Sequence, residues 1–182
     1  MSSEADLIRL AQAGDGNSIS MIYEKYHTGV FKFLYYRVGE VETAEDLTSE
    51  VFLRMIRSLS HFRPQSISFQ AWLFQIARNL SIDYYRKQAL QNHTALEEDL
   101  VSPDEPLDKA VERKLDHLNL RKALVRLPED QRDVIVLRFI VGMAIQETAS
   151  TLHKSEDSIK GLQRRALITL RETLQNWEIS NV

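Results

Sequence analysis

The sequence predicts an all-α protein made of two small helical domains. Apolar side chains recur every three or four residues along most of the chain, and this spacing places them on one face of a helix. Only 6 Gly and 4 Pro interrupt the 182 residues, so few positions force a helix to end. One polar, acidic stretch, residues 92–106, separates residues 1–91 from residues 107–182.

The first two helices are bounded by short local signals. Ser3 and Asp6 fit a capping box at the start of the first helix, and Gly14 provides its end. The second helix is expected to begin near Asn17 and to end by Gly39. Apolar positions between these limits recur at helical spacing.

A third helix is predicted to open at Thr43, in a capping pattern with Asp46. Its apolar stripe is spaced by four residues. The stripe consists of Leu47, Val51, Met55 and Leu59. Residues 61–68 (HFRPQSIS) should break the helix, because Pro64 disfavours helical backbone at the residue before it.

The next predicted helix starts with residues 69–87 (FQAWLFQIARNLSIDYYRK) and fades near Gln91. Its apolar face consists of Phe69, Trp72, Leu73, Ile76 and Leu80. The other side suits unpaired bases, because rings stack on bases and amides bond base edges. That side consists of Phe74, Gln75, Arg78, Asn79, Ser81, Asp83, Tyr85 and Arg86. The alternative is a helix buried on two sides, with Phe74 and Tyr85 packed against another element.

The polar stretch carries the clearest charge asymmetry of the chain. Residues 91–120 hold 3 basic and 8 acidic side chains, a balance of −5, whereas residues 121–182 hold 10 basic and 8 acidic side chains, a balance of +2. Residues 92–106 also contain two prolines, so we interpret them as a flexible linker. Pro106 can start the next helix. The core face of that helix is expected to consist of Leu107, Val111, Leu115, Leu118 and Leu124.

A further helix should start at Pro128, since proline suits the first helical position and acids favour the first turn, here Glu129 and Asp130. This helix is predicted to run to Gly142. A short helix, residues 144–152, follows it.

The last predicted helix makes a helix-turn-helix with the short one before it. His153 and Lys154 form the break, and Ser155 caps a helix that runs to about Leu174. The inward face is expected to consist of Ile159, Leu162, Ala166 and Leu170. The outward, DNA-facing set consists of Ser155, Glu156, Ser158, Lys160, Arg164 and Arg165. The alternative is an ordinary surface helix of a bundle.

No catalytic constellation is visible. Glu45, Asp46 and Glu50 are more simply a helix start than a metal site, and the 5 histidines show no ligand spacing. We therefore expect neither enzymatic activity nor a cofactor or metal. The acidic start lacks a long apolar run, no stretch approaches the ~20 apolar residues of a membrane span, and cysteine is absent. These features predict a cytoplasmic protein without a signal peptide.

Four segments, in order, resemble an extracytoplasmic-function (ECF) sigma factor of the sigma-70 family. They are QAGDGNSISMIYEKYHTGVFKFL, AEDLTSEVFLRMIRSL, FQAWLFQIARNLSIDYYRK and LPEDQRDVIVLRFIVGMAIQETASTLHKSEDSIKGLQRRALITLRE. The resemblance covers nearly the whole chain. It implies a specificity subunit of bacterial RNA polymerase without catalytic residues, with a region 2 domain at 1–91, a linker at 92–106 and a region 4 domain at 107–182.

The resemblance also implies a role for particular residues. Docking on the clamp coiled coil of the polymerase β′ subunit would fall to Asp46, Leu47, Glu50 and Phe52. Recognition and melting of the −10 element would fall to Arg63, Gln75, Arg78, Asn79, Asp83 and Arg86. The loop at 61–68 would pocket one flipped base. Recognition of the −35 element would fall to Ser155, Glu156, Ser158, Lys160, Arg164 and Arg165.

The partners that the resemblance implies are core RNA polymerase, through the β′ clamp coiled coil and the β flap, and promoter DNA. An anti-sigma factor is a further implied partner and could hold the chain at a membrane. Two alternatives are a stand-alone helix-turn-helix regulator and a helical nucleic-acid-processing enzyme. The single-strand-binding helix favours a sigma factor over the regulator, and the lack of catalytic side chains speaks against the enzyme.

Overall fold

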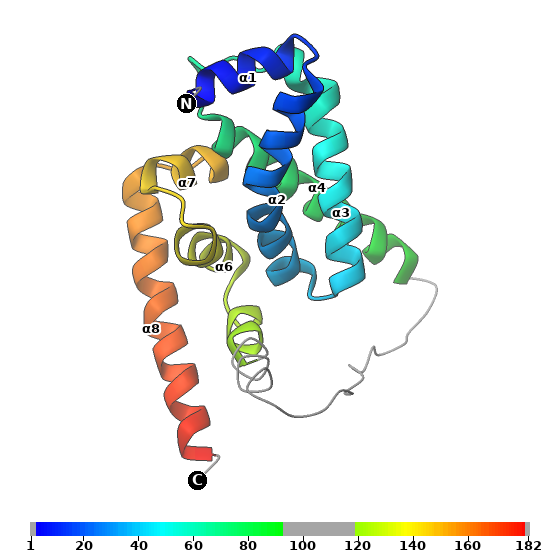
Figure 1. Ribbon diagram of the computed structural model, residues 1–182. Coiled ribbons are helices and arrows are strands. Elements are labelled where there is room, and N and C mark those ends of the chain that lie inside the picture. The colour runs from blue at the N-terminus through cyan, green and yellow to red at the C-terminus, as the bar shows by residue number, and fades with distance from the viewer. Residues whose placement is uncertain (1–2, 93–118, 181–182) are drawn as a thin grey trace, which may run out of the picture.

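The computed structural model describes residues 3–92 and 119–180, which we call the N-terminal and C-terminal units (Figure 1). The N-terminal unit consists of α1 (Glu4–Gln12), α2 (Gly16–Val38), α3 (Val41–Ser58), the 3₁₀ helix η1 (Leu59–His61) and α4 (Phe69–Asn92). The C-terminal unit consists of helical residues 119–125, α6 (Glu129–Ile135), the π-helix η2 (Val136–Val141), α7 (Ile145–Leu152) and α8 (Glu156–Ser180). The all-α prediction is confirmed for these residues.

Part of the prediction concerns the segment between the two units. Residues 93–106 of the predicted linker, and the apolar positions from Leu107 to Leu118, lie outside the described residues. Leu124, the last position of that predicted face, is described and fully buried. Among the helices of the two units, none combines the length and the apolar character that crossing a membrane requires.

The first two helix starts follow from side-chain caps. The Ser3 hydroxyl accepts a hydrogen bond from the Asp6 amide at 3.2 Å, and an Asp6 carboxylate oxygen accepts one from the Ser3 amide at 3.3 Å. The predicted capping box is therefore confirmed. Asp15 caps α2 by accepting from the Ser18 amide at 2.8 Å, so this helix begins one residue before the expected Asn17.

The prediction that the third helix opens at Thr43 is wrong, because α3 already begins at Val41. The Thr43 hydroxyl instead donates to the Glu40 carboxylate at 2.5 Å, inside the first turn. The reason is the tight connection from α2, which ends at Gly39 with a left-handed backbone (φ 84°). The predicted stop at Gly39 is confirmed.

The backbone at Gly39 should disfavour any side chain. Its positive φ disfavours an L-residue, and an added Cβ would collide with the Arg121 guanidinium group. We expect Gly39→Ala to lower the free energy of unfolding by about 1–2 kcal/mol in urea titrations. Gly16→Ala is the control, because Gly16 is helical and has no atom within 4 Å of the added Cβ. Equal stability of the two variants would contradict this account of the turn.

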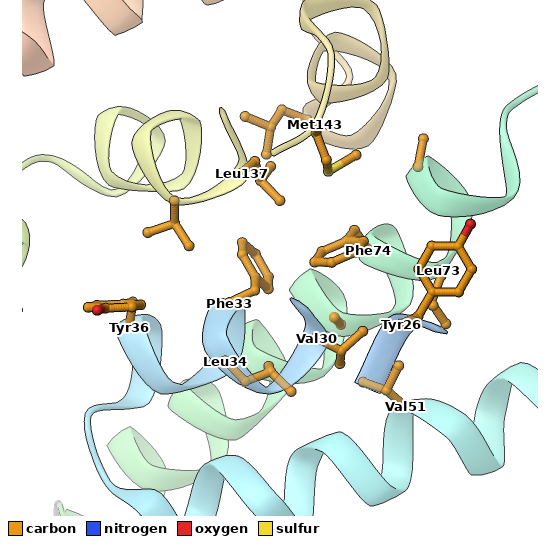
Figure 2. Packing of buried hydrophobic residues seen from close by; sticks show 14 of the residues in the cluster. Tyr26, Val30, Phe33, Leu34, Tyr36, Val51, Leu73, Phe74, Leu137 and Met143 are labelled. Atoms are coloured by element: carbon orange, nitrogen blue, oxygen red, sulfur yellow. The ribbon is translucent and has the colours of Figure 1, made fainter. Parts of the chain in front are cut away.

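Buried side chains of α2 lie at the centre of the N-terminal unit. Val30 and Leu34 point toward Val51 of α3, and Leu73 of α4 lies beside them (Figure 2). The other buried edge of α2 faces the C-terminal unit, where Leu137 and Met143 complete the layer. One continuous apolar core therefore joins the two units.

Helix α4 is buried on two sides at Phe74, which corrects one prediction. The alternative, with Phe74 and Tyr85 both packed, is confirmed for Phe74 only, because Tyr85 is 38% exposed and its hydroxyl donates to the Arg37 carbonyl. Phe74 was expected on the base-facing side but is 0% exposed. Its ring meets Phe33 edge-on at a centroid distance of 5.7 Å and lies beneath Leu137 and Met143 (Figure 2). Ser81, expected on the same side, is also fully buried, and its hydroxyl donates to the Arg78 carbonyl at 2.7 Å. The C-terminal unit supplies the second partner surface.

The first helix after Leu127 differs from its prediction at its start and in the hydrogen bonding of its second half. Pro128 is the residue that precedes α6, so the helix begins at Glu129 and not at the proline. The helix passes directly into η2, which ends at Gly142 with φ 85°. The predicted end is confirmed, whereas the π-helical hydrogen bonding of Val136–Val141 was not predicted.

Candidate nucleic-acid interface

Helices α7 and α8 form the predicted helix-turn-helix. His153 ends α7 with a left-handed backbone (φ 53°), and the Lys154 amide donates to the Ala149 carbonyl at 3.0 Å. The Ser155 hydroxyl accepts from the Ser158 amide at 3.2 Å and so caps α8. The predicted break and cap are confirmed, although α8 continues to Ser180.

The two faces of α8 divide as its periodicity predicts. The buried face consists of Ile159, Leu162, Ala166 and Leu170. The predicted DNA-facing set is exposed throughout and consists of Ser155, Glu156, Ser158, Lys160, Arg164 and Arg165. Lys160 pairs with Asp157 at 3.1 Å, whereas Arg164 and Arg165 have no ion-pair partner among the residues that the structure describes. Their guanidinium groups are therefore available to phosphates and base edges.

The loop between η1 and α4 is largely exposed and faces α7 of the C-terminal unit. Residues 64–68 and four residues of the C-terminal unit, Ala144, Gln146, Glu147 and Ser150, line an open cavity of about 610 Å³. Ser68 donates through its hydroxyl to Glu147 at 3.3 Å across this cavity. Arg63 is exposed, but one of its guanidinium nitrogens donates to the Ser60 and Phe62 carbonyls at 2.9 and 3.0 Å.

Two residues predicted to read the −10 element contact the C-terminal unit instead of solvent. The Gln75 amide donates to the Ser150 carbonyl at 2.8 Å. The Arg78 guanidinium group donates to Asp133 at 3.2 Å and lies 3.7 Å from Asp130. Both side chains are half-buried, so neither is free to bind a base in this arrangement.

The other predicted −10 residues on α4 lie on its open side. Asn79 and Arg86 are exposed. Asp83 lies between two arginines, 3.9 Å from Arg54 and 3.8 Å from Arg86. The structure therefore brings these three residues together on one surface and separates them from the two that the C-terminal unit covers.

A buried ion pair joins the two units and was not predicted. The side chains of Arg37 and Asp133 are 1% and 0% exposed, and the Arg37 guanidinium group donates to Asp133 and, at 2.6 Å, to Glu129. Burial raises the pKa of Asp133, and the contacts with Arg37 and Arg78 oppose this rise. The hydrogen bond from Arg37 lowers the pKa of Glu129. Two features of the sequence could have indicated this ion pair. Arg37 lies within the apolar run YYRV, and Asp133 directly precedes the apolar residues of RDVIV.

The residues predicted to dock on polymerase differ in accessibility along α3. Asp46 is exposed, Leu47 is half-buried, and Glu50 binds Arg54 at 3.0 Å. Phe52 is only 4% exposed and packs beneath the Tyr23 ring at a centroid distance of 4.7 Å. Phe52 therefore packs beneath the exposed surface of α3 and does not form part of that surface. The exposed apolar side chains of this helix, which the prediction did not include, are Val41, Leu53 and Ile56.

Comparison with known proteins identifies both units. Residues 22–91 match Sigma-70 region 2, and residues 123–172 match Sigma-70, region 4. The chain is 38% identical over 172 residues to the ECF RNA polymerase sigma factor BldN of Streptomyces coelicolor, covering 93% of this chain and 65% of that protein. It is 35% identical over 164 residues to the ECF RNA polymerase sigma factor SigX of Bacillus subtilis, covering 87% and 84%.

A solved structure shares the fold of most of this chain. The sigma factor RpoE of Bartonella quintana, solved in complex with the anti-sigma factor NepR, superposes with a TM-score of 0.70 at 23% sequence identity. The match covers 86% of this chain and 96% of that one. The chain therefore spans nearly all of that protein, but only 65% of the length of BldN.

Proposed function

This chain belongs to the ECF group of the sigma-70 family, and we propose that it reads promoters with two surfaces, one of which is covered while the two units are docked. One observation carries the proposal. The −35 set at the start of α8 is exposed, whereas Gln75 and Arg78 of the −10 set bind the C-terminal unit. The docked protein is therefore inactive in promoter opening, which requires the two units to separate.

The proposed −35 surface has the geometry of a recognition helix. The N-terminal turns of α8 present short polar side chains, which suit close approach to base edges in the major groove. Arg164 and Arg165 follow on the same helix and would bind guanine edges or phosphates. Glu156 and Asp157 lie at the helix start, so sequence-independent attraction to DNA should be weak there.

We expect the double variant Arg164→Ala and Arg165→Ala to weaken the salt dependence of promoter binding. Each phosphate contact contributes about 0.9 to the slope of log affinity against log salt, so the slope should fall by about 2. The measurement is a salt titration of holoenzyme binding to a promoter that wild-type holoenzyme selects from a random library. Arg9→Ala, an exposed arginine on α1, is the control. An unchanged slope would exclude these two contacts.

The proposed −10 surface must offset the cost of opening DNA. Separating about five base-pair steps costs roughly 7 kcal/mol at a mean of about 1.4 kcal/mol per step. Stacking returns about 1–3 kcal/mol for each captured base. With Gln75 and Arg78 bound elsewhere, Arg63 in the loop and Asn79, Asp83 and Arg86 on α4 are the members of the −10 set that remain on the open surface. The docked protein should therefore bind single-stranded −10 DNA weakly.

Each surface of the protein has a proposed partner. We propose that core polymerase binds α3 through its β′ clamp coiled coil and the C-terminal unit through its β flap, and that it performs the chemistry of RNA synthesis in the cytoplasm. The proposed region 2 and region 4 domains span residues 1–91 and 107–182, with a linker at 92–106. An anti-sigma factor is a further proposed partner, because the Bartonella quintana protein of this fold was solved with one.

Reconstitution with core polymerase tests the proposed function. The purified chain, added to core enzyme and a library-selected promoter, should produce run-off transcripts that depend on both promoter elements. Core enzyme alone should produce none. Tight duplex binding by the chain without polymerase, together with no transcript, would instead identify a stand-alone helix-turn-helix regulator.

A further inference from the structure

The last residue of α1 contacts the backbone on both sides of η1. The Gln12 side-chain amide nitrogen donates to the Leu59 carbonyl at 2.9 Å and to the Phe62 carbonyl at 3.0 Å. These acceptors lie at the start of η1 and just after its end, 47 and 50 residues away from Gln12. One side chain therefore fixes the point at which the chain leaves α3 and enters the loop at 61–68.

The same point of the loop is held by two further contacts. The Phe62 ring is 3% exposed and lies on Trp72 and Phe69, with centroid distances of 4.9 and 5.4 Å. The Phe62 carbonyl also accepts from Arg63 at 3.0 Å, so it has two donors. Beyond Arg63, residues 64–68 have few bonds within the N-terminal unit and line the cavity described above. The loop thus has a fixed base and an open tip.

Helix α1 is itself anchored at its other end, so it can act as a rigid support. The Glu4 carboxylate accepts from Lys25 at 2.5 Å and from the Tyr26 hydroxyl, and both donors lie on α2. The capping box at Ser3 stabilises the first turn. Gln12 is therefore presented to the loop from a helix that is fixed on α2.

We propose that Gln12 is a positioning residue for base capture, and this proposal rests on the proposed function. A primary amide has two N–H donors, which is the number that the two carbonyls require. A carboxylate has none, and a thioether has none. By holding the base of the loop, Gln12 fixes the point from which residues 64–68 extend, so that the loop is ordered before a flipped base reaches it. Such preorganisation increases affinity because the loop need not be ordered on binding.

The test is a double-mutant cycle that combines a substitution of Gln12 with removal of the captured base. Holoenzymes containing wild-type or Gln12→Met chain are titrated with a single-stranded −10 oligonucleotide and with copies in which one base at a time is replaced by an abasic site. At the captured position, the abasic site should weaken wild-type binding by about 5- to 150-fold, the range that stacking of one base gives. In the Gln12→Met holoenzyme the same abasic replacement should weaken binding less. The logarithm of its fold-change should be below about half of the wild-type value.

Two controls separate positioning from a loss of structure. Gln88→Met makes the same chemical change at an exposed position of α4 and should retain the wild-type penalty. Gln12→Lys keeps an N–H donor at this position and should restore part of the wild-type penalty. If Gln12→Met melts below the assay temperature, both holoenzymes are titrated below the melting temperature of the variant.

The outcomes distinguish the two proposals. A folded Gln12→Met holoenzyme that shows the full wild-type penalty at the captured position would overturn the role of Gln12 and leave the proposed function intact. A wild-type holoenzyme that shows no base-dependent binding at any position would overturn the proposed function itself.

Discussion

Replacing Asp133 with asparagine is expected to separate the two units of the free protein. The substitution keeps the size of the side chain but removes the buried charged partner of Arg37, which keeps only its ion pair with the half-exposed Glu129 among the described residues. Removing one member of a buried ion pair costs about 3–5 kcal/mol, because the remaining charge is not solvated. Separation lets Arg37 reach water, so the variant can avoid this cost by opening while each unit stays folded.

The interdomain distance is the quantity to measure. The chain has no cysteine, so Asn17→Cys and Glu172→Cys, both at exposed positions, accept a donor and an acceptor dye without further changes. Asp133→Asn should lower energy transfer in the free protein and increase its affinity for single-stranded −10 DNA. A shift of 3 kcal/mol corresponds to more than about 100-fold in the ratio of docked to separated protein.

Asp130→Asn is the matched control. Asp130 pairs with Lys154 at 2.9 Å and lies 3.7 Å from Arg78, but its side chain is 40% exposed. Exposed pairs contribute only about 0–1 kcal/mol, so the control should change energy transfer little. Circular dichroism of both variants checks that the helices persist. Asp133→Asn with full helicity and unchanged energy transfer would show that the buried pair does not hold the units together.

The double variant Arg78→Ala and Asn79→Ala should strongly impair promoter opening by the holoenzyme. Each lost hydrogen bond to DNA costs about 1–3 kcal/mol, and the two together should reduce the open fraction by about 100-fold. Permanganate reactivity of unpaired thymines in the −10 region measures this fraction. Lys87→Ala, an exposed basic residue on the same helix, is the control.

The same double variant should also change the free protein. This second effect tests whether Arg78 holds the two units together as well as binding DNA. Because Arg78 also donates to Asp133, its removal should decrease energy transfer in the free protein. A role in docking alone would give separated units with normal promoter opening. Normal opening in a folded variant would therefore remove Arg78 and Asn79 from the −10 surface.

The helix boundaries were predictable because their causes are local. Ser3, Asp6 and Ser155 cap helices by contacts with residues three positions away, and Gly39 and Gly142 end helices through their own backbone conformation. The six exposed positions of α8 followed from helical periodicity in the same way. Errors of one or two residues arose where two helices meet with almost no connection between them.

The second face of α4 was not predictable from its periodicity. A polar and aromatic face can meet solvent, DNA or another domain, and the sequence of the helix does not distinguish these surroundings. Phe74 is buried because Leu137 and Met143 cover it, and Arg78 is paired because Asp133 lies opposite. The pair of Arg37 and Asp133 joins residues 96 positions apart, and no local pattern encodes such a contact.

Energy transfer between dyes at positions 17 and 172, recorded before and after addition of core polymerase, tests the central claim most directly. Transfer should be high in the free chain, fall when core polymerase binds, and stay low while promoter DNA is opened. Transfer that stays high in a complex that is actively making promoter-dependent transcripts would contradict the claim that the covered −10 surface must be released.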